Sequence, residues 1–267
     1  MAGVRLTVGN VEIVSVSDGQ GDMNPTEAFP ASDIEIWRTE YPDLVDAADQ
    51  IHPRFGSFGV SSGGRLVLVD TGLGGPDATL LSDMKANGIE REAVDLVVLT
   101  HIHPDHVGWN LSDGSPTFPN ARYLVTKTDW DHWTQPEVRA QAPHVDAQMV
   151  PLESLNVLDL IDGEYSVTNE LTTLPTPGHT PGHISIAVAS GGERAFILGD
   201  VAHTPAQAQY TDWSPVFDTD PDLARETRHA VLDKLEDEGT LVASGHFPGP
   251  GYGRFVRSGE RRIWQPE

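Results

Sequence analysis

The strongest constraint on this chain is a run of six residues that contains three histidines and one aspartate. The run follows the apolar segment 95–99, which has the composition of a short buried strand. His101 and His103 are two positions apart, so in extended backbone their side chains lie on the same side of the chain. Asp105 and His106 complete the run. This loop therefore offers two ligands to one metal ion and two to a neighbouring ion.

Three further ligand candidates stand at the ends of later apolar runs. His179 lies in the turn Pro-Gly-His-Thr-Pro-Gly-His, Asp200 follows Phe-Ile-Leu-Gly, and His246 follows Ser-Gly. The turn also contains His183, which competes with His179 as the ligand. Because α/β folds collect functional groups at strand ends, we expect these residues to meet the histidine loop. Imidazole nitrogen and carboxylate oxygen suit zinc, and also iron, manganese or cobalt.

Strands and helices are predicted to alternate along the chain. Helical periodicity marks 78–87, 128–134 and 221–238, and a further helix is expected to start near Val107. Segments rich in β-branched and apolar residues, bounded by turn residues, predict strands at 11–16, 65–69, 95–99, 122–125, 184–188, 195–198 and 241–243.

No long polar linker interrupts this alternation, so we predict a single α/β domain over 1–267. The segment 21–55 is rich in proline and is predicted to be irregular. A long irregular segment in a compact domain is often a functional lid or cap. Three interpretations stay open for it: a cap over a pocket, a homodimer contact, or a plain surface excursion.

The acidic composition limits the partners. The 267 residues carry a formal net charge of −23, which repels nucleic-acid phosphates and anionic membranes, so we expect neither as a partner. The absence of cysteine excludes disulfides, thiolate ligands and a cysteine nucleophile. No apolar window is long enough to span a membrane, and the first residues lack the apolar core of a signal peptide. We therefore expect a cytoplasmic protein that acts on a small-molecule substrate.

Taken together, the motifs resemble those of the metallo-β-lactamase superfamily. Their order is His-x-His-x-Asp-His, Pro-Gly-His-Thr, Gly-Asp and Gly-His. The spacings are 73, 21 and 46 residues from His106 to His179, then to Asp200, then to His246. The resemblance extends over about 56–246 and implies a four-layer αββα sandwich with metal ions at one edge.

The resemblance also implies a role for each ligand. An Asp-Thr-Gly turn at Asp70 is similar to the family's early turn, and Asp70 is expected to support the ligand loop. The family pattern favours His179 over His183, which we expect to be structural. Seven ligands to two divalent ions, expected to be zinc, are implied: His101, His103 and His179 on the first ion, Asp105, His106 and His246 on the second, and Asp200 between them.

Seven ligands are too many for one tetrahedral ion, whereas two ions that share a carboxylate use all of them. A water held between two such ions ionises near neutral pH, and the resulting bridging hydroxide is the expected nucleophile. Asp105 is a candidate to pass a proton to the leaving group. The predicted function is a dinuclear metal-dependent hydrolase that opens an ester-type bond, namely a lactone or a related ester or phosphotriester.

Other segments resemble the branch that includes quorum-quenching lactonases and methyl parathion hydrolase. They are Trp-Asn after the histidine loop, 118–123, 128–133, and the stretch 198–207. Many of those lactonases have a tyrosine three residues after the bridging aspartate, where this chain has His203. His203 is a candidate catalytic residue that donates a hydrogen bond to the substrate. A purely structural role for it stays open.

Two other functions stay open. A thioesterase of the glyoxalase II type shares the histidine motifs. However, only 21 residues follow His246, which leaves no room for the helical region that binds glutathione in those enzymes. A non-catalytic binding protein on the same fold is the second alternative, although such relatives typically lose ligands. Aromatic residues near the motifs either line an apolar pocket or pack in the core: Trp37, Trp109, Trp130, Trp133, Tyr210 and Trp213.

Overall fold

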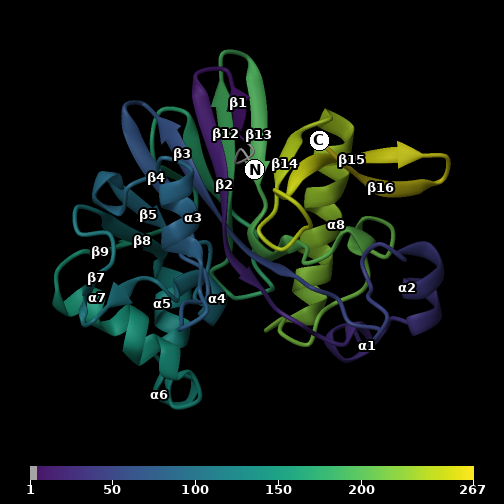
Figure 1. The fold of residues 1–267 in the computed structure, drawn as a ribbon, viewed down its shortest axis with the longest axis horizontal. Helices are drawn as coiled ribbons and strands as arrows, with labels where there is room; N and C mark the ends of the chain where they lie inside the picture. The colour runs from purple at the N-terminus through teal and green to yellow at the C-terminus, as the bar shows by residue number, and fades with distance from the viewer. Residues whose placement is uncertain (1–4) are drawn as a thin grey trace.

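Two mixed seven-stranded sheets form the centre of the computed structural model, which describes residues 5–267 (Figure 1). The first sheet comprises, in spatial order, β1 (Arg5–Val8), β2 (Val11–Gln20), β3 (Arg54–Ser62), β4 (Arg65–Val69), β5 (Leu96–Val98), β8 (Arg122–Thr126) and β9 (Leu158–Ile161). The second comprises β10 (Tyr165–Ser166), β11 (Leu171–Pro175), β12 (Ile184–Ser190), β13 (Glu193–Ile197), β14 (Leu241–Ala243), β15 (Tyr252–Ser258) and β16 (Arg261–Pro266). A separate two-stranded sheet pairs β6 (Leu111–Ser112) with β7 (Ser115–Pro116).

Period-two alternation along the strands builds the layers. In β4, Val67 and Val69 face one way and join Ile186 of β12 in the cluster that fills the space between the two sheets. Leu68 faces the opposite way and packs in a second cluster that includes Leu80. Because successive strand side chains point to opposite faces, one apolar strand serves both the inner and the outer layer.

Helices cover the outer face of each sheet. Helices α3, α5 and α7 contribute to the cluster outside the first sheet, and α8 contributes to the cluster outside the second. This arrangement confirms the predicted four-layer αββα sandwich. The α-helices are α1 (Pro25–Ala28), α2 (Ile34–Glu40), α3 (Leu80–Ala86), α4 (Pro104–Val107), α5 (Lys127–Trp133), α6 (Pro136–Arg139), α7 (Val150–Ser154) and α8 (Pro221–Glu238). Single-turn helices lie at η1 (Arg91–Ala93), η2 (Val145–Met149), η3 (Gly199–Val201) and η4 (Pro205–Ala208).

Helix α8 is the longest helix that the structure describes, and both of its ends are fixed. The Asp220 side chain accepts a hydrogen bond from the Leu223 backbone N–H, as expected of a helix N-cap. Gly239 ends the helix in the left-handed conformation, at φ 58°. Leu232 is fully buried in the cluster outside the second sheet. The charged side chain of Arg228 is also fully buried.

The segment predicted to be irregular contains two short helices, α1 and α2, and its last residues begin β3. Trp37 of α2 is fully buried and lies 5.9 Å from Phe29 and 5.2 Å from Trp213, measured between ring centroids. A backbone hydrogen bond from the Met23 N–H to the Ile51 carbonyl joins the two ends of the segment. The segment therefore has its own small apolar core, built with residues that follow η3.

All seven predicted strands and the three predicted helices occur, with ends that differ by a few residues. The helix expected near Val107 instead begins at Pro104, so Asp105 and His106 lie within α4. Proline fits this first helical position because it has no backbone N–H to leave unpaired. Over residues 5–267, no helix has the length and apolarity that a bilayer crossing requires.

The turn between β11 and β12 packs directly against α8. Gly178 in this turn has φ 125°, and a Cβ atom on it would overlap the backbone of Ala224. We expect Gly178→Ala to lower the free energy of unfolding by at least about 2 kcal/mol more than Gly163→Ala. Gly163 also has a positive φ, of 53°, but nothing lies near its missing Cβ. Urea unfolding of the metal-free variants measures both losses, and equal losses would show that α8 does not restrict the turn.

Candidate metal centre

The predicted ligands come from both sheets and meet at one edge. The histidine loop follows β5 of the first sheet. His179 lies in the β11–β12 turn, Asp200 lies in η3 after β13, and His246 follows β14. The parallel pairing of β13 with β14 brings the carboxyl ends of these two strands together. The fold therefore places every predicted ligand at the edge that the sequence indicated.

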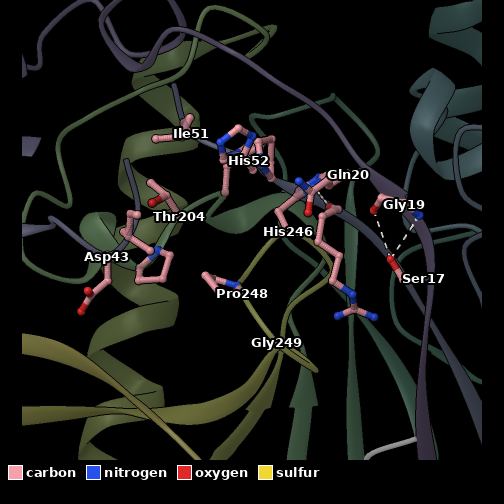
Figure 2. A pocket seen from close by; sticks show the side chains of 15 residues that line it. Ser17, Gly19, Gln20, Asp43, Ile51, His52, Thr204, His246, Pro248 and Gly249 are labelled. Atoms are coloured by element: carbon pink, nitrogen blue, oxygen red, sulfur yellow. Dashed lines mark hydrogen bonds between the residues drawn. The ribbon is translucent and has the colours of Figure 1, made fainter. Parts of the chain in front are cut away.

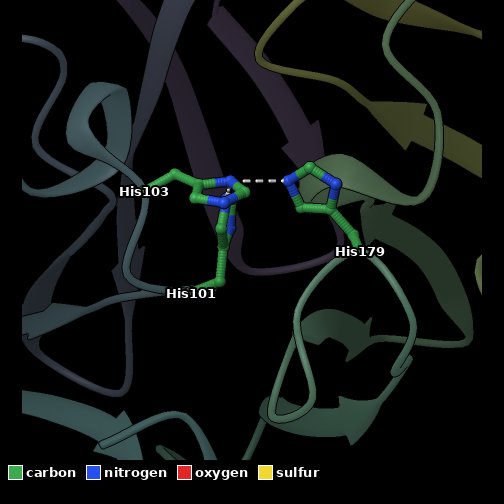
Figure 3. Close-up of side chains that lie close together, drawn as sticks. All are labelled: His101, His103 and His179. Carbon is green, nitrogen blue, oxygen red and sulfur yellow. Dashed lines mark hydrogen bonds between the residues drawn. The ribbon is translucent and has the colours of Figure 1, made fainter. Parts of the chain in front are cut away.

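Three imidazoles form the first cluster (Figure 3). His103 Nδ1 lies 3.1 Å from His101 Nε2 and 2.8 Å from His179 Nε2. His101 is fully buried and His179 is nearly so. Figure 3 shows ring nitrogens of the three residues directed at one another, with His101 and His103 on one loop and His179 on another. Such a convergence of nitrogen atoms matches a site for one metal ion.

The second cluster consists of Asp105, His106 and His246. Asp105 Oδ2 lies 3.7 Å from His106 Nε2 and 3.6 Å from His246 Nε2. Both imidazoles are buried, whereas Asp105 is partly exposed. The helix α4 presents Asp105 and His106 together, which explains how adjacent residues reach the same cluster.

Asp200 lies between the two clusters. Its Oδ1 is 3.4 Å from His106 Nε2, and its Oδ2 is 3.3 Å from His179 Nε2. Oδ2 is also 3.1 Å from His246 Nε2. One carboxylate thus reaches imidazoles of both clusters, as a ligand shared by two ions would.

The donor set fits metal ions better than hydrogen bonds alone. His106 Nε2 and Asp200 Oδ1 are buried without a hydrogen-bond partner. Burial, with the charges of nearby imidazoles, holds the pKa of His101 and His103 well below the usual value, so both keep free lone pairs. Buried polar atoms without partners are costly, and nitrogen and oxygen donors that converge in this way suit a dinuclear centre.

Nearby carboxylates raise the pKa of two other imidazoles, those of His106 and His179. Burial disfavours a charged His106, but Asp200, Asp70 and Asp105 outweigh it and hold the pKa of His106 well above its usual value. Burial likewise opposes charge on His179, yet hydrogen bonds to Asp200 and Asp218 raise its pKa to about 9. A metal ion must therefore displace protons at these imidazoles.

The protein holds the nitrogen that faces away from the second cluster in both of its imidazoles, His106 and His246. His106 Nδ1 lies 2.8 Å from Asp70 Oδ2, and Asp70 also accepts hydrogen bonds from the Thr100 N–H and hydroxyl. His246 Nδ1 donates to the Arg54 carbonyl at 2.8 Å. Such contacts fix the tautomer and ring orientation of a metal ligand. The expectation that Asp70 supports the ligand loop therefore agrees with its contacts.

Asp129 is a supporting residue that the sequence analysis missed. Its side chain is fully buried and accepts hydrogen bonds from the N–H groups of Ile102 and Gly182, at 3.0 and 2.7 Å. It thus ties the histidine loop of the first sheet to the β11–β12 turn of the second. Asp218 and Arg228, near and within α8, also contact the site and were missed, because no local motif marks them.

His183 lies behind the site, and none of the metal-binding groups found over residues 5–267 includes it. Its Nδ1 donates to the Thr176 carbonyl at 3.0 Å. Its Nε2 accepts from the Asp200 backbone N–H at 2.8 Å. Burial lowers the pKa of His183 to about 3, so the ring is neutral. Both nitrogens are engaged by backbone groups, and the ring positions the loop that carries Asp200.

His203 is buried in the metal centre itself. Its Nε2 lies 3.1 Å from Asp200 Oδ2, and its ring stacks on that of His246 with a centroid distance of 5.5 Å. His203 also forms a ligand-like group with His179 and Asp200. Neither of its ring nitrogens has a partner of suitable hydrogen-bond geometry.

An apolar cavity of about 380 Å³ opens onto the ligands Asp105, His179, Asp200 and His246. The segment 21–55 supplies much of its wall. Its apolar lining comprises Met23, Phe29, Ile51, Pro53, Phe55, Leu73, Pro104 and Phe217. None of the six aromatic residues singled out in the sequence lines this cavity, and phenylalanines take that place. Trp37, Tyr210 and Trp213 instead pack with the segment in a separate core cluster.

A second hollow of about 480 Å³ adjoins the first at His203 and His246 (Figure 2). Polar groups such as Ser17, Thr204 and His52 contribute to its lining. Among the residues of the candidate site, His203 and His246 line both spaces.

Comparison with known sequences decides the family. Residues 57–246 match the profile of the metallo-beta-lactamase superfamily. The chain belongs to the metallo-beta-lactamase superfamily. It is 24% identical over 171 residues to an N-acyl homoserine lactonase of Bacillus thuringiensis, covering 62% of this chain and 61% of the lactonase. It is 30% identical over 179 residues to the N-acyl homoserine lactonase AttM of Rhizobium radiobacter, covering 64% and 65%. The matches thus span less than two thirds of each of these two lactonases.

Solved structures of the superfamily share the whole fold. The hydrolase AbOPH has a TM-score of 0.89 and 27% identity, and the match covers 100% of this chain and 98% of AbOPH. The dizinc quorum-quenching lactonase AidC, with a product bound, has a TM-score of 0.87 and 23% identity, over 100% and 97%. The predicted resemblance to the lactonase branch is confirmed by the sequence relatives, which are N-acyl homoserine lactonases, and AidC adds a likeness of fold.

The contacts of the two histidines of the β11–β12 turn predict different effects on metal content. We expect His179→Ala to lose about one metal equivalent of two, because it removes one nitrogen from the first cluster. We expect His183→Ala to retain both equivalents and to lose about 1–3 kcal/mol of stability, because the Asp200 N–H loses its acceptor. Elemental analysis and thermal unfolding of both variants measure these effects. Loss of one equivalent in His183→Ala alone would reverse the assignment.

Proposed function

We propose that this protein is a metal-dependent hydrolase of the lactonase branch that opens the ester bond of a lactone carrying an apolar chain. The observation that carries the proposal is the position of the clustered ligands at one wall of the apolar cavity. Superfamily membership and the lactonase relatives support it. Related esters and phosphotriesters are the next candidates, because they present the same kind of electrophilic oxygen-bearing centre.

The residues would hold two divalent ions, zinc first among them. Such ions, when bound, activate water as a nucleophile and polarise the carbonyl or phosphoryl oxygen of a substrate. The far-nitrogen contacts of the imidazoles keep the remaining ring nitrogens directed inward. The proposed ligands are His101, His103 and His179 for one ion, Asp105, His106 and His246 for the other, and Asp200 for both.

Two side chains are proposed to act on the substrate directly. Asp105 is the least buried of the clustered carboxylates and lines the cavity, so it is placed to deliver a proton to the leaving oxygen. His203 lines both the cavity and the adjoining hollow. Its ring nitrogens lack partners of suitable geometry, and we propose that one donates a hydrogen bond to the substrate oxygen.

The apolar cavity sets the expected substrate preference. Phe29, Phe55 and Phe217 offer contact area to an acyl chain, and burial of each methylene contributes about 0.8 kcal/mol. The segment 21–55 acts as the cap that excludes water from the acyl chain of the substrate. Its alternative use as a homodimer contact stays a prediction.

Hydrolysis rates of the zinc-loaded protein test the proposal. We expect turnover of an acyl lactone that chelator abolishes, with kcat/KM rising about fourfold per added methylene until the cavity is full. An aryl phosphotriester and an acyl thioester serve as comparison substrates. A preference for the thioester would move the protein to the glyoxalase II type. Absence of turnover on all three substrates would contradict the proposed function.

Substitution of His203 tests its proposed contact with the substrate. We expect His203→Phe to lower kcat/KM about a hundredfold while both metal ions stay bound, because the aromatic ring fills the space without a donor. His229→Phe, at an exposed position of α8, is the matched control and should behave as the wild type. Loss of metal from His203→Phe would instead make His203 a ligand, and unchanged kinetics would make it structural.

A further inference from the structure

A buried carboxylate outside all the sequence motifs contacts one proposed ligand. Asp218 Oδ1 lies 2.9 Å from His179 Nδ1, and the Asp218 side chain has no exposed surface. With Nδ1–H donated to this carboxylate, the lone pair of His179 is on Nε2, the nitrogen that faces His103. Asp218 therefore selects the tautomer in which His179 presents a ligand atom to the first cluster.

A fully buried arginine holds Asp218 in turn. Arg228 Nη2 donates to Asp218 Oδ2 at 3.2 Å, so the two carboxylate oxygens serve two different partners. The remaining guanidinium nitrogens donate to backbone carbonyls: Nε to Val201 at 2.7 Å, and Nη1 to Thr211 and Trp213, both at 3.1 Å. Each guanidinium nitrogen is thus engaged, and its fork geometry fixes where Asp218 can lie.

The same arginine connects the loops of two proposed ligands. Val201, whose carbonyl it binds, directly follows Asp200. On the other side, the Thr219 N–H donates to the His179 carbonyl at 2.9 Å, and the Asp220 N–H donates to the Gly178 carbonyl at 3.0 Å. Residues 218–228 therefore fix the His179 side chain and the backbone of its turn in position relative to the Asp200 loop.

We propose that Asp218 and Arg228 form a buried positioning pair that orients His179 and sets its affinity for the first metal ion. The proposal rests on the metal centre of the proposed function. Carboxylates that accept from the far nitrogen of a ligating histidine increase its basicity, and their removal typically weakens metal binding 10–100-fold. The alternative, that Asp218 only compensates the charge of Arg228, predicts an effect on stability and none on metal affinity.

Binding of Co²⁺ to the metal-free protein separates these two roles. We expect Asp218→Asn to bind one of two Co²⁺ ions 10–100-fold more weakly in chelator competition, with the other ion unaffected. The visible absorption of the weakened ion should change, because its imidazole ligand is no longer held in one orientation. Asparagine preserves an oxygen acceptor and the side-chain size, so the variant removes mainly the charge.

Asp220→Asn is the matched control. It removes a carboxylate two residues away, and asparagine still caps α8. Circular dichroism of the metal-free variants tests folding. If Asp218→Asn does not fold, Asp218→Glu replaces it, because the charge is kept and only the position of the carboxylate changes. The glutamate variant should show the same weakening of one ion.

The results separate the positioning pair from the centre on which it depends. Wild-type Co²⁺ affinity and absorption in a folded Asp218 variant would overturn the positioning role while leaving the proposed function in place. Failure of the wild-type chain to bind two Co²⁺ ions would overturn the metal centre and, with it, the pair.

Discussion

The convergence of unsatisfied donor atoms in a water-poor site is the constraint on which this structure depends. Asp200 is buried among imidazoles that reach it from several loops, and Oδ1 has no hydrogen-bond partner. In such surroundings, carboxylate and imidazole atoms without a partner raise the free energy of the folded state unless an ion or a hydrogen-bonding group binds them. The protein holds these rings in place through their outer nitrogens. Asp70 contacts Nδ1 of His106, and the Arg54 carbonyl accepts a hydrogen bond from Nδ1 of His246. The inner atoms stay directed at the same small volume.

The sandwich serves this purpose because neither sheet carries the site alone. The first sheet brings the histidine loop after β5, and the second brings His179, Asp200 and His246. Asp129 joins the two halves through one carboxylate that binds the backbone of both loops. The apolar core between the sheets therefore also sets the geometry of the metal centre. Because each cluster combines residues of both sheets, a change of packing between the sheets would alter the distances within each cluster.

The sequence predicted the ligands more completely than the residues that support them. Ligands are recognisable because metal chemistry requires particular residue types at short spacing, as in the loop from His101 to His106. Asp129 and Asp218 are single carboxylates, and no pattern of neighbours distinguishes them from surface acids. The two partners of Asp129 lie 27 and 53 residues away, and the histidine that Asp218 contacts lies 39 residues away. Strands such as β3, with its glycines and serines, lack the apolar runs that marked the others. The cavity lining was also missed, because tertiary packing decided which aromatic side chains face it.

The order of the ligands along the chain has a consequence for how the protein acquires its metal during folding. His101 and His246 are separated by 145 residues, and Asp200 and His246 become neighbours only when β14 pairs with β13 across the length of α8. A chain that has emerged from the ribosome only as far as α3 and the histidine loop presents four donors and no partner sheet. Long-range strand pairing is slow compared with local helix formation. Pairing of β14 with β13 is therefore required before the four donors of the histidine loop can meet all three donors from the second sheet in one site.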